Sequence, residues 1–258
     1  MKLFETITIL IIGLSLLFPV ISFATPSKEL YNTDLFSDAN LVSYYRLEDV
    51  ADSKGTNTLT NVSSTPFSAA KFNLGADFGA NNIYKYLTTT STFSIGATST
   101  SFTVSLWVKM YSLGQVSTMF SNGNNTIAKT YINIRVDSGN LIFERTAQAN
   151  DASNGSVSVS ESTYLSTANS VHLAGTYNGS DNLSFYVNGN LVGSKTLVAG
   201  NGTDNVSEGS AIGANFIAGA GKQSSIIDDV SIFSRVLTVA EIRSISGASK
   251  IRGMGITR

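Results

Sequence analysis

The segment Ser170–Ser194 constrains the fold more than any other part of the chain. Within it, Leu183, Phe185 and Val187 alternate with polar or amphipathic neighbours, which is the period of two that a half-buried strand shows. The pair Asn188–Gly189 follows directly, and these residue types tolerate the positive φ angles of a tight type I′ turn. The segment therefore predicts two strands and a hairpin, and it indicates an antiparallel β-protein.

The same alternation recurs elsewhere, between clusters of Gly, Asn, Asp and Ser. In Phe102–Lys109, the apolar side chains share one face, so Trp107 is predicted to point away from them. A second hairpin is predicted where Asp137–Asn140 turns the chain. Many short strands separated by turns are typical of a β-sandwich.

One helix is predicted near the end of the chain. It begins at Thr238, because Thr238 and Glu241 have the spacing of a capping box, and Ile242 and Ile245 form one apolar stripe. Gly247 ends it. The preceding strands and this helix fit a single domain over residues 41–249, with a polar leader at residues 25–40 and a flexible tail at residues 250–258.

Residues 1–24 have the chemistry of a secretory signal peptide. Lys2 precedes an apolar run from Ile7 to Ile21, and Ser22 and Ala24 are the small residues of a cleavage site. The apolar run is shorter than the ~20 residues that a membrane span needs, although an uncleaved anchor is the alternative. We expect export, with no integral membrane span after cleavage.

The composition excludes some partners. Charged residues make up 14% of the chain and the formal net charge is −1. Binding to nucleic acid or to an acidic membrane surface depends on clustered Lys and Arg, so neither partner is expected. The chain has no cysteine, so no disulfide stabilises the exported protein and a large core must do so.

Several stretches resemble, in the same order, the motifs of laminin-G-like, concanavalin-A-like jelly-roll domains. The resemblance covers about residues 41–246 and implies an all-β, antiparallel sandwich of jelly-roll type. One departure is Ser170, which stands where the family usually has a Trp that makes a packing contact. The stretches are Tyr44–Glu48, Asp52–Gly55, Lys71–Gly79, Phe102–Lys109, His172–Gly193 and Ile227–Ile242.

The sequence offers few residues that could carry out catalysis. In the strand Ile226–Phe233, strict alternation places Asp228 on the face of Val230 and Asp229 on the opposite face. That is the wrong geometry for the paired carboxylates of a glycosidase. With His172 as the single histidine and no cysteine, a His/Cys zinc site or a Cys–His pair is excluded. We therefore expect a protein that is not an enzyme.

Trp107 is open to two interpretations, whereas His172 has one expected role. Trp107 is a candidate platform on which a sugar ring stacks, and the alternative is a Trp that is covered by a loop or packed in a second small core. His172 is expected to be a structural strand residue bonded to a neighbour, because no second His or carboxylate is spaced beside it.

A structural Ca²⁺ is the hypothesis for a metal site. Calcium prefers several oxygen ligands. The resemblance places the turn with Asp52 near the beginning of the domain and the strand with Asp228 near its end, where the two ends of a jelly roll often pair. The alternative is a carboxylate at position 228 that accepts backbone N–H groups.

These observations predict a secreted, non-catalytic binding module that recognises a glycan or an extracellular or cell-surface protein. A structural or adhesive surface protein without a small ligand is the first alternative. A degenerate glycoside hydrolase is the second.

Overall fold

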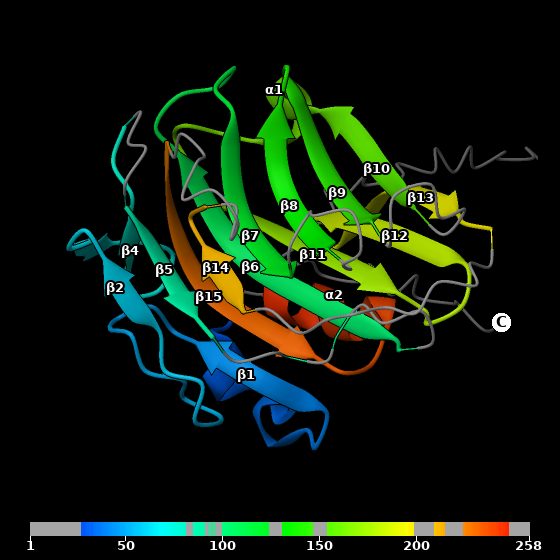
Figure 1. Ribbon diagram of the computed structural model, residues 1–258, viewed down its shortest axis with the longest axis horizontal. Helices are drawn as coiled ribbons and strands as arrows, with labels where there is room; N and C mark the ends of the chain where they lie inside the picture. Colours follow the sequence, from blue (N-terminus) through cyan, green and yellow to red (C-terminus); the bar gives the residue numbers. More distant parts are fainter. Residues whose placement is uncertain are drawn as a thin grey trace, which may run out of the picture.

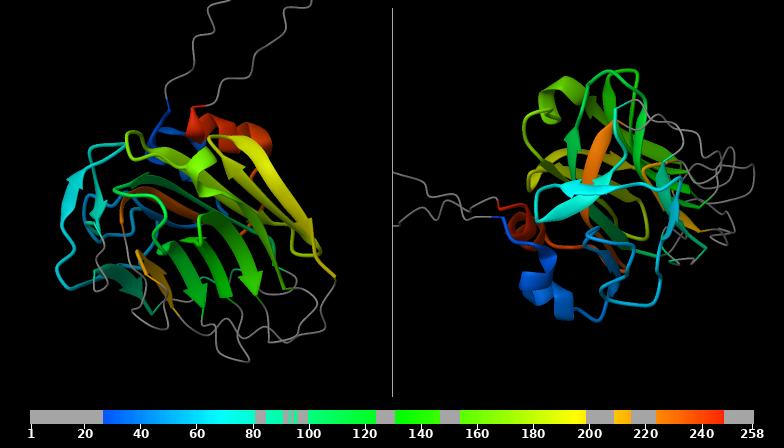
Figure 2. Two further views of the ribbon diagram at one scale, coloured as in Figure 1. Left: turned by 90° about the horizontal axis from the view of Figure 1, so that it is seen from above. Right: turned by 90° about the vertical axis from the view of Figure 1, so that its left-hand side faces the viewer.

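The computed structural model describes residues 27–80, 85–90, 93, 95, 100–123, 131–146, 154–198, 209–214 and 224–247. The predicted signal peptide and the predicted tail lie outside these residues. The described chain folds into two antiparallel sheets that pack face to face (Figures 1 and 2), which confirms the expected all-β sandwich of jelly-roll type. Among the described residues, no helix has the length and apolar character needed to cross a membrane.

The first sheet has eight strands, with the order β13-β12-β11-β6-β15-β4-β3 and with β1 paired to β15 beside this row. The second sheet has seven, in the order β10-β9-β8-β7-β14-β5-β2. Strands of the first sheet are β1 Leu41–Tyr45, β3 Phe67–Ala69, β4 Leu74–Asp77, β6 Phe102–Met110, β11 Val171–Tyr177, β12 Asn182–Val187, β13 Asn190–Thr196 and β15 Ser225–Phe233. Strands of the second are β2 Thr60–Val62, β5 Tyr86–Thr89, β7 Ser117–Gly123, β8 Tyr131–Asp137, β9 Asn140–Thr146, β10 Gly155–Ser160 and β14 Ser210–Ile212.

Both predicted hairpins form. Asn188 and Gly189 have φ angles of 47° and 75° between β12 and β13, as a type I′ turn requires. Ser138 and Gly139, with φ angles of 51° and 76°, join β8 to β9 in the same way. These turns fix the register of the two edge regions of the sandwich.

The main core lies between the sheets. It contains the predicted inward faces of β6 and β8, including Val104, Leu106 and Ile134. The sheets approach closely at Gly175 of β11, where an added Cβ would lie 2.5 Å from the ring of Phe143 on β9. A glycine is therefore needed at this position for the aromatic ring to pack.

A second apolar cluster covers the outer face of the first sheet. Residues 27–40, which the sequence suggested were a polar leader, form a strap that contains two short 3₁₀ helices, η1 Leu30–Asn32 and η2 Asp34–Ser37. Leu30 and Leu35 are buried there, beside helix α2, Val239–Ser246. Figure 2 shows the strap in blue and α2 in red side by side on this face. The described part of the predicted leader, residues 27–40, therefore packs against the first sheet.

The predicted helix is confirmed. Thr238 accepts a hydrogen bond from the backbone N–H of Glu241, the Glu241 side chain returns the contact, and Gly247 ends the helix with a φ of 73°. A one-turn helix, α1 Glu161–Tyr164, was not predicted.

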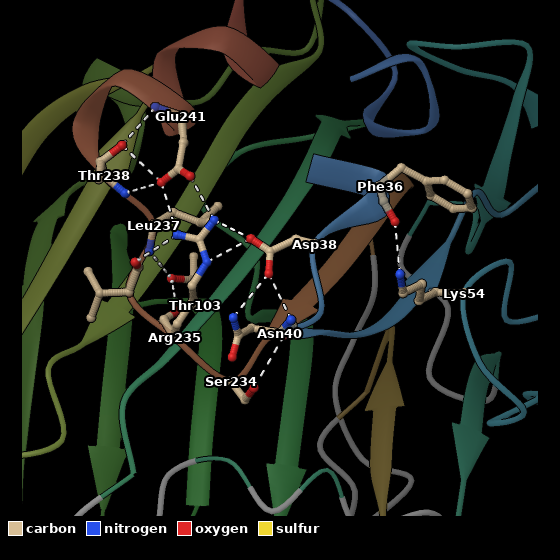
Figure 3. Close-up of polar contacts among 11 residues, drawn as sticks. Phe36, Asp38, Asn40, Lys54, Thr103, Ser234, Arg235, Leu237, Thr238 and Glu241 are labelled. Carbon is tan, nitrogen blue, oxygen red and sulfur yellow. Dashed lines mark hydrogen bonds and ion pairs between the residues drawn. The ribbon is translucent and has the colours of Figure 1, made fainter. Parts of the chain in front are cut away.

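Arg235 fastens the strap to α2 (Figure 3). Its guanidinium forms ion pairs with Asp38 of the strap and with Glu241 of α2. Lys54 adds a hydrogen bond of 2.9 Å from its Nζ to the carbonyl oxygen of Phe36. These contacts hold the strap over the first sheet.

Candidate functional site

A β-bulge in β15 brings two carboxylates to the same face. The register of β15 against β6 shifts between Asp228 and Ser231, and Asp229 has a φ of 54°. Ile227 and Val230 both belong to the main core, so the residues between them point outward together. The predicted alternation, with Asp228 on the face of Val230 and opposite to Asp229, is therefore wrong. The extra residue of the bulge breaks the period of two.

Asp228 is buried beneath the turn between β3 and β4. Its Oδ2 accepts a hydrogen bond of 2.7 Å from the backbone N–H of Phe72, while its Oδ1 has no partner in the described part of the chain. Burial raises the pKa of this carboxyl to about 8, and the neighbouring Asp229 adds to the effect.

Asp229 lies beneath the strap. Its Oδ1 accepts a hydrogen bond from the hydroxyl of Tyr44, and its Oδ2 accepts one of 3.3 Å from the backbone N–H of Leu30. Burial raises the pKa of Asp229 to about 7, against the lowering effect of these two donors. Burial and the nearby Asp229 also raise the pKa of the Tyr44 hydroxyl far above its usual range.

Trp107 faces outward from β6, as predicted, but only 3% of it is exposed. It stands directly across from Asp228 in the sheet. The ring of Phe72 meets it edge-on at 5.9 Å, and Nζ of Lys71 lies 4.4 Å from the centre of the indole. The described structure thus covers the Trp107 face on which a sugar was expected to stack, and the residues that cover it come from the β3–β4 turn.

His172 has the structural surroundings expected of it. It pairs with Trp107 across the sheet, and its Nε2 lies 2.7 Å from Oγ of Ser105. Complete burial lowers the pKa of the imidazole to about 3, so the ring is neutral at physiological pH.

Asp52, in the turn after β1, is held by hydrogen-bond donors. Its two oxygens accept hydrogen bonds from the hydroxyl of Ser43 and from the backbone N–H groups of Tyr44, Lys54 and Asn57. A calcium ion needs oxygen ligands, and the groups around Asp52 instead present hydrogen atoms to it. No group of three acidic or histidine side chains suited to a metal occurs in the described residues. A calcium shared by Asp52 and Asp228 was an expectation from the sequence, and no contact described here joins the two residues.

A groove lies between the strap and the β3–β4 turn, the two segments whose backbone N–H groups bond to Asp229 and Asp228. Its volume is about 580 Å³. Its walls are Ser27, Lys28, Glu29 and Asn32 from the strap and Lys71, Phe72 and Asn73 from the turn.

Ion pairs and hydrogen bonds fix two of the polar groups that line the groove. Arg46 forms ion pairs with both Glu29 and Glu48. Glu48 accepts a hydrogen bond of 2.8 Å from the side-chain amide of Asn73. The carboxylate of Glu29 and the amide of Asn73 are therefore held on opposite walls through shared partners.

Of the residues that line this groove, the sequence analysis singled out none. Their positions were missed because the strap was interpreted as a leader and the β3–β4 turn as a scaffold motif. The available signal was the apolar content of the strap, where Leu30 and Leu35 stand five positions apart within a polar stretch.

Residues 78–243 match the sequence profile of the laminin-G family described as the concanavalin A-like lectin/glucanases superfamily. The match covers more than half of the chain. The chain belongs to this superfamily. No curated protein sequence gave a match.

Solved structures share the fold at low sequence identity. The binding domain of Paraclostridial Mosquitocidal Protein 1 has a TM-score of 0.62 at 19% identity, over 80% of this chain and 52% of that one. The binding domain of botulinum neurotoxin DC in complex with SialylT has a TM-score of 0.62 at 17% identity, over 82% and 52%. The botulinum neurotoxin serotype G binding domain has 0.61 at 19%, over 80% and 50%. This superfamily member spans about half the length of each of those chains.

Proposed function

We propose that this protein is a secreted, non-catalytic binding module that recognises a glycan through the groove between the strap and the β3–β4 turn. The observation that carries the proposal is the lining of this groove. An aromatic ring, two amides, a carboxylate and two ammonium groups border one depression of about 580 Å³.

This lining suits a hydroxyl-rich ligand. A sugar hydroxyl both donates and accepts hydrogen bonds, and the side chains of Asn32 and Asn73 offer both roles. Glu29 supplies an acceptor, and Lys28 and Lys71 supply donors. Phe72 offers an apolar surface of the kind that binding sites combine with a few placed polar groups.

The structural relatives support the coarser part of the proposal, because their names describe binding domains and one is a complex with SialylT. The carboxylate pair of β15 favours binding over hydrolysis. Asp228 and Asp229 are 2% and 4% exposed and are capped by backbone N–H groups, so a glycosidic bond does not reach them.

The test is glycan binding by the secreted protein, measured on an array and then by calorimetry with the best ligand. Lys28→Ala and Asn32→Ala change exposed groove side chains and should weaken binding at least about tenfold, which corresponds to a loss of one or two hydrogen bonds. Lys195→Ala and Asn169→Ala remove the same side chains elsewhere on the exposed surface and should leave the affinity unchanged.

Three outcomes would contradict the glycan proposal. An array without signal, together with self-association in light scattering, favours a structural or adhesive protein. An array without signal, together with saturable binding to a purified extracellular protein, favours a protein partner. Glycan binding that is equally weakened by the control variants would place the site elsewhere.

A further inference from the structure

The two carboxylates of the bulge reach opposite walls of the groove. Asp228 accepts a hydrogen bond from the backbone N–H of Phe72, which belongs to the wall formed by the β3–β4 turn. Asp229 accepts one from the backbone N–H of Leu30, which follows the groove residue Glu29 in the strap. Adjacent residues of one strand therefore bind both walls.

We infer that Asp228 and Asp229 are positioning residues, a clasp that fixes the two walls of the groove relative to each other. The inference rests on the proposed function for its biological meaning, because the groove is the proposed ligand site. Its physical content, which is that each carboxylate holds one wall, stands on the hydrogen bonds alone.

The bulge is what makes the clasp possible. In a regular strand, the residue after Asp228 would point into the main core, where an unpaired carboxylate is costly. The extra residue keeps Val230 in the core and turns Asp229 toward the strap. The positive φ of Asp229 is a conformation that Asp and Asn adopt more readily than most residues.

The strap backbone is also bonded by Lys54, at the carbonyl oxygen of Phe36, six positions after Leu30. On the strap, the ion pair of Glu29 with Arg46 acts through side chains. On the turn, Lys71 and Phe72 rest on Trp107 through ring contacts. The hydrogen bonds to Asp228 and Asp229 instead hold backbone N–H groups directly, and a buried N–H that loses its acceptor carries a desolvation penalty.

The protein contains its own reporter for one wall. Trp107 is the only tryptophan in the chain, and Lys71 and Phe72 of the turn cover it. If the turn is released from Asp228, acrylamide gains access to the indole. The other wall is reported by trypsin, because cleavage after the exposed Lys28 requires the strap to leave the sheet locally.

Two variants separate the anchors. Asp228→Ala removes the partner of Phe72 and should raise the acrylamide quenching constant of Trp107 by about twofold or more, with little change in cleavage after Lys28. Asp229→Gly removes the partner of Leu30 while preserving a residue that adopts positive φ. It should speed cleavage after Lys28 by about fivefold or more, with little change in quenching.

Conservative variants and an exposed carboxylate serve as controls. Asp228→Asn and Asp229→Asn retain an acceptor oxygen and should restore both readouts toward the values of the unmodified protein. Asp181→Ala, in the exposed turn between β11 and β12, should change neither. Unchanged quenching in folded Asp228→Ala, or a parallel change of both readouts in both variants, would overturn the clasp.

Hydrogen exchange of the unmodified protein keeps the inference testable if the Ala or Gly variant does not fold. The amides of Phe72 and Leu30 should exchange slowly although neither residue lies in a strand. Exchange of both at the rate of unstructured amides would overturn the clasp. Absence of glycan binding with both anchors intact would contradict the proposed function and leave the clasp standing.

Discussion

The hydroxyl of Tyr44 donates a hydrogen bond to Oδ1 of Asp229, although the two residues stand 185 positions apart in the chain. Tyr44 lies on β1, the first strand, and Asp229 lies in the bulge of the last strand. The backbone N–H of the same Tyr44 donates to Asp52 at 3.0 Å. One residue therefore connects Asp52, in the turn after β1, with Asp229 in the bulge of β15.

Replacement of Tyr44 by Phe should destabilise the protein. The ring stays in the outer cluster, but the buried carboxylate of Asp229 loses a donor, which typically costs about 1–3 kcal/mol. Chemical denaturation measures the free energy of unfolding. The double variant Tyr44→Phe/Asp229→Asn should lose less than the sum of the single variants, because the two residues share one interaction. Strict additivity would contradict a direct bond between them.

The ion pairs of Arg235 with Asp38 and Glu241 predict a loss of stability in acid. The hydrogen bond from Arg235 lowers the pKa of Glu241. Burial alone would raise the pKa of Asp38, but Arg235 and Asn40 hold it below its usual range. A lowered folded-state pKa adds stability above the unfolded value of about 4, and this stability is lost as the pH falls through the folded value.

Thermal melting of the unmodified protein and of Arg235→Gln between pH 3 and 7 tests the contribution of these ion pairs. The two melting curves should differ most near neutral pH and converge below pH 4. Because these side chains are partly exposed, the difference should be about 1 kcal/mol or less per ion pair. A constant difference at all pH values would mean that Arg235 acts through packing alone.

Most of the sandwich could be predicted from the sequence because its signals are local. Alternation in Phe102–Lys109, the pair Asn188–Gly189 and the capping box at Thr238 each depend on neighbouring residues, and each appears in the structure as expected. Trp107 was likewise placed on the correct face of β6.

The candidate site could not be predicted because it depends on contacts between distant segments. The bulge at Asp229 leaves little trace in the sequence beyond a residue type that tolerates positive φ. The strap lacks periodicity, since its Leu30 and Leu35 are ordered by packing against α2 rather than by local propensity. Hence the groove emerges only when the strap and the β3–β4 turn are placed side by side.

The contact between Gly175 and Phe143 predicts a cost for a single added methyl group. In Gly175→Ala the new Cβ would lie 2.5 Å from the Phe143 ring, and overpacking of this kind typically costs about 1–3 kcal/mol. Phe143→Leu should recover part of this loss when combined with Gly175→Ala, although it is destabilising alone. Denaturant unfolding of the four proteins gives the comparison. An unchanged stability of Gly175→Ala would show that the two sheets move apart here enough to accommodate the added methyl group.

The last prediction concerns calcium, and the hydrogen bonds of Asp52 decide its direction. Since all described partners of Asp52 are donors, we expect the melting temperature to stay the same when calcium is added or chelated. A calcium ion held by Asp52 and Asp228 at a hundredfold excess over its Kd would instead add about 2.7 kcal/mol. For a domain of this size, that is a rise of about 5–10 °C. Asp34→Asn, on the exposed strap surface, is the control. A rise that Asp228→Asn abolishes and Asp34→Asn retains would establish the metal site and contradict the purely hydrogen-bonded role of Asp52.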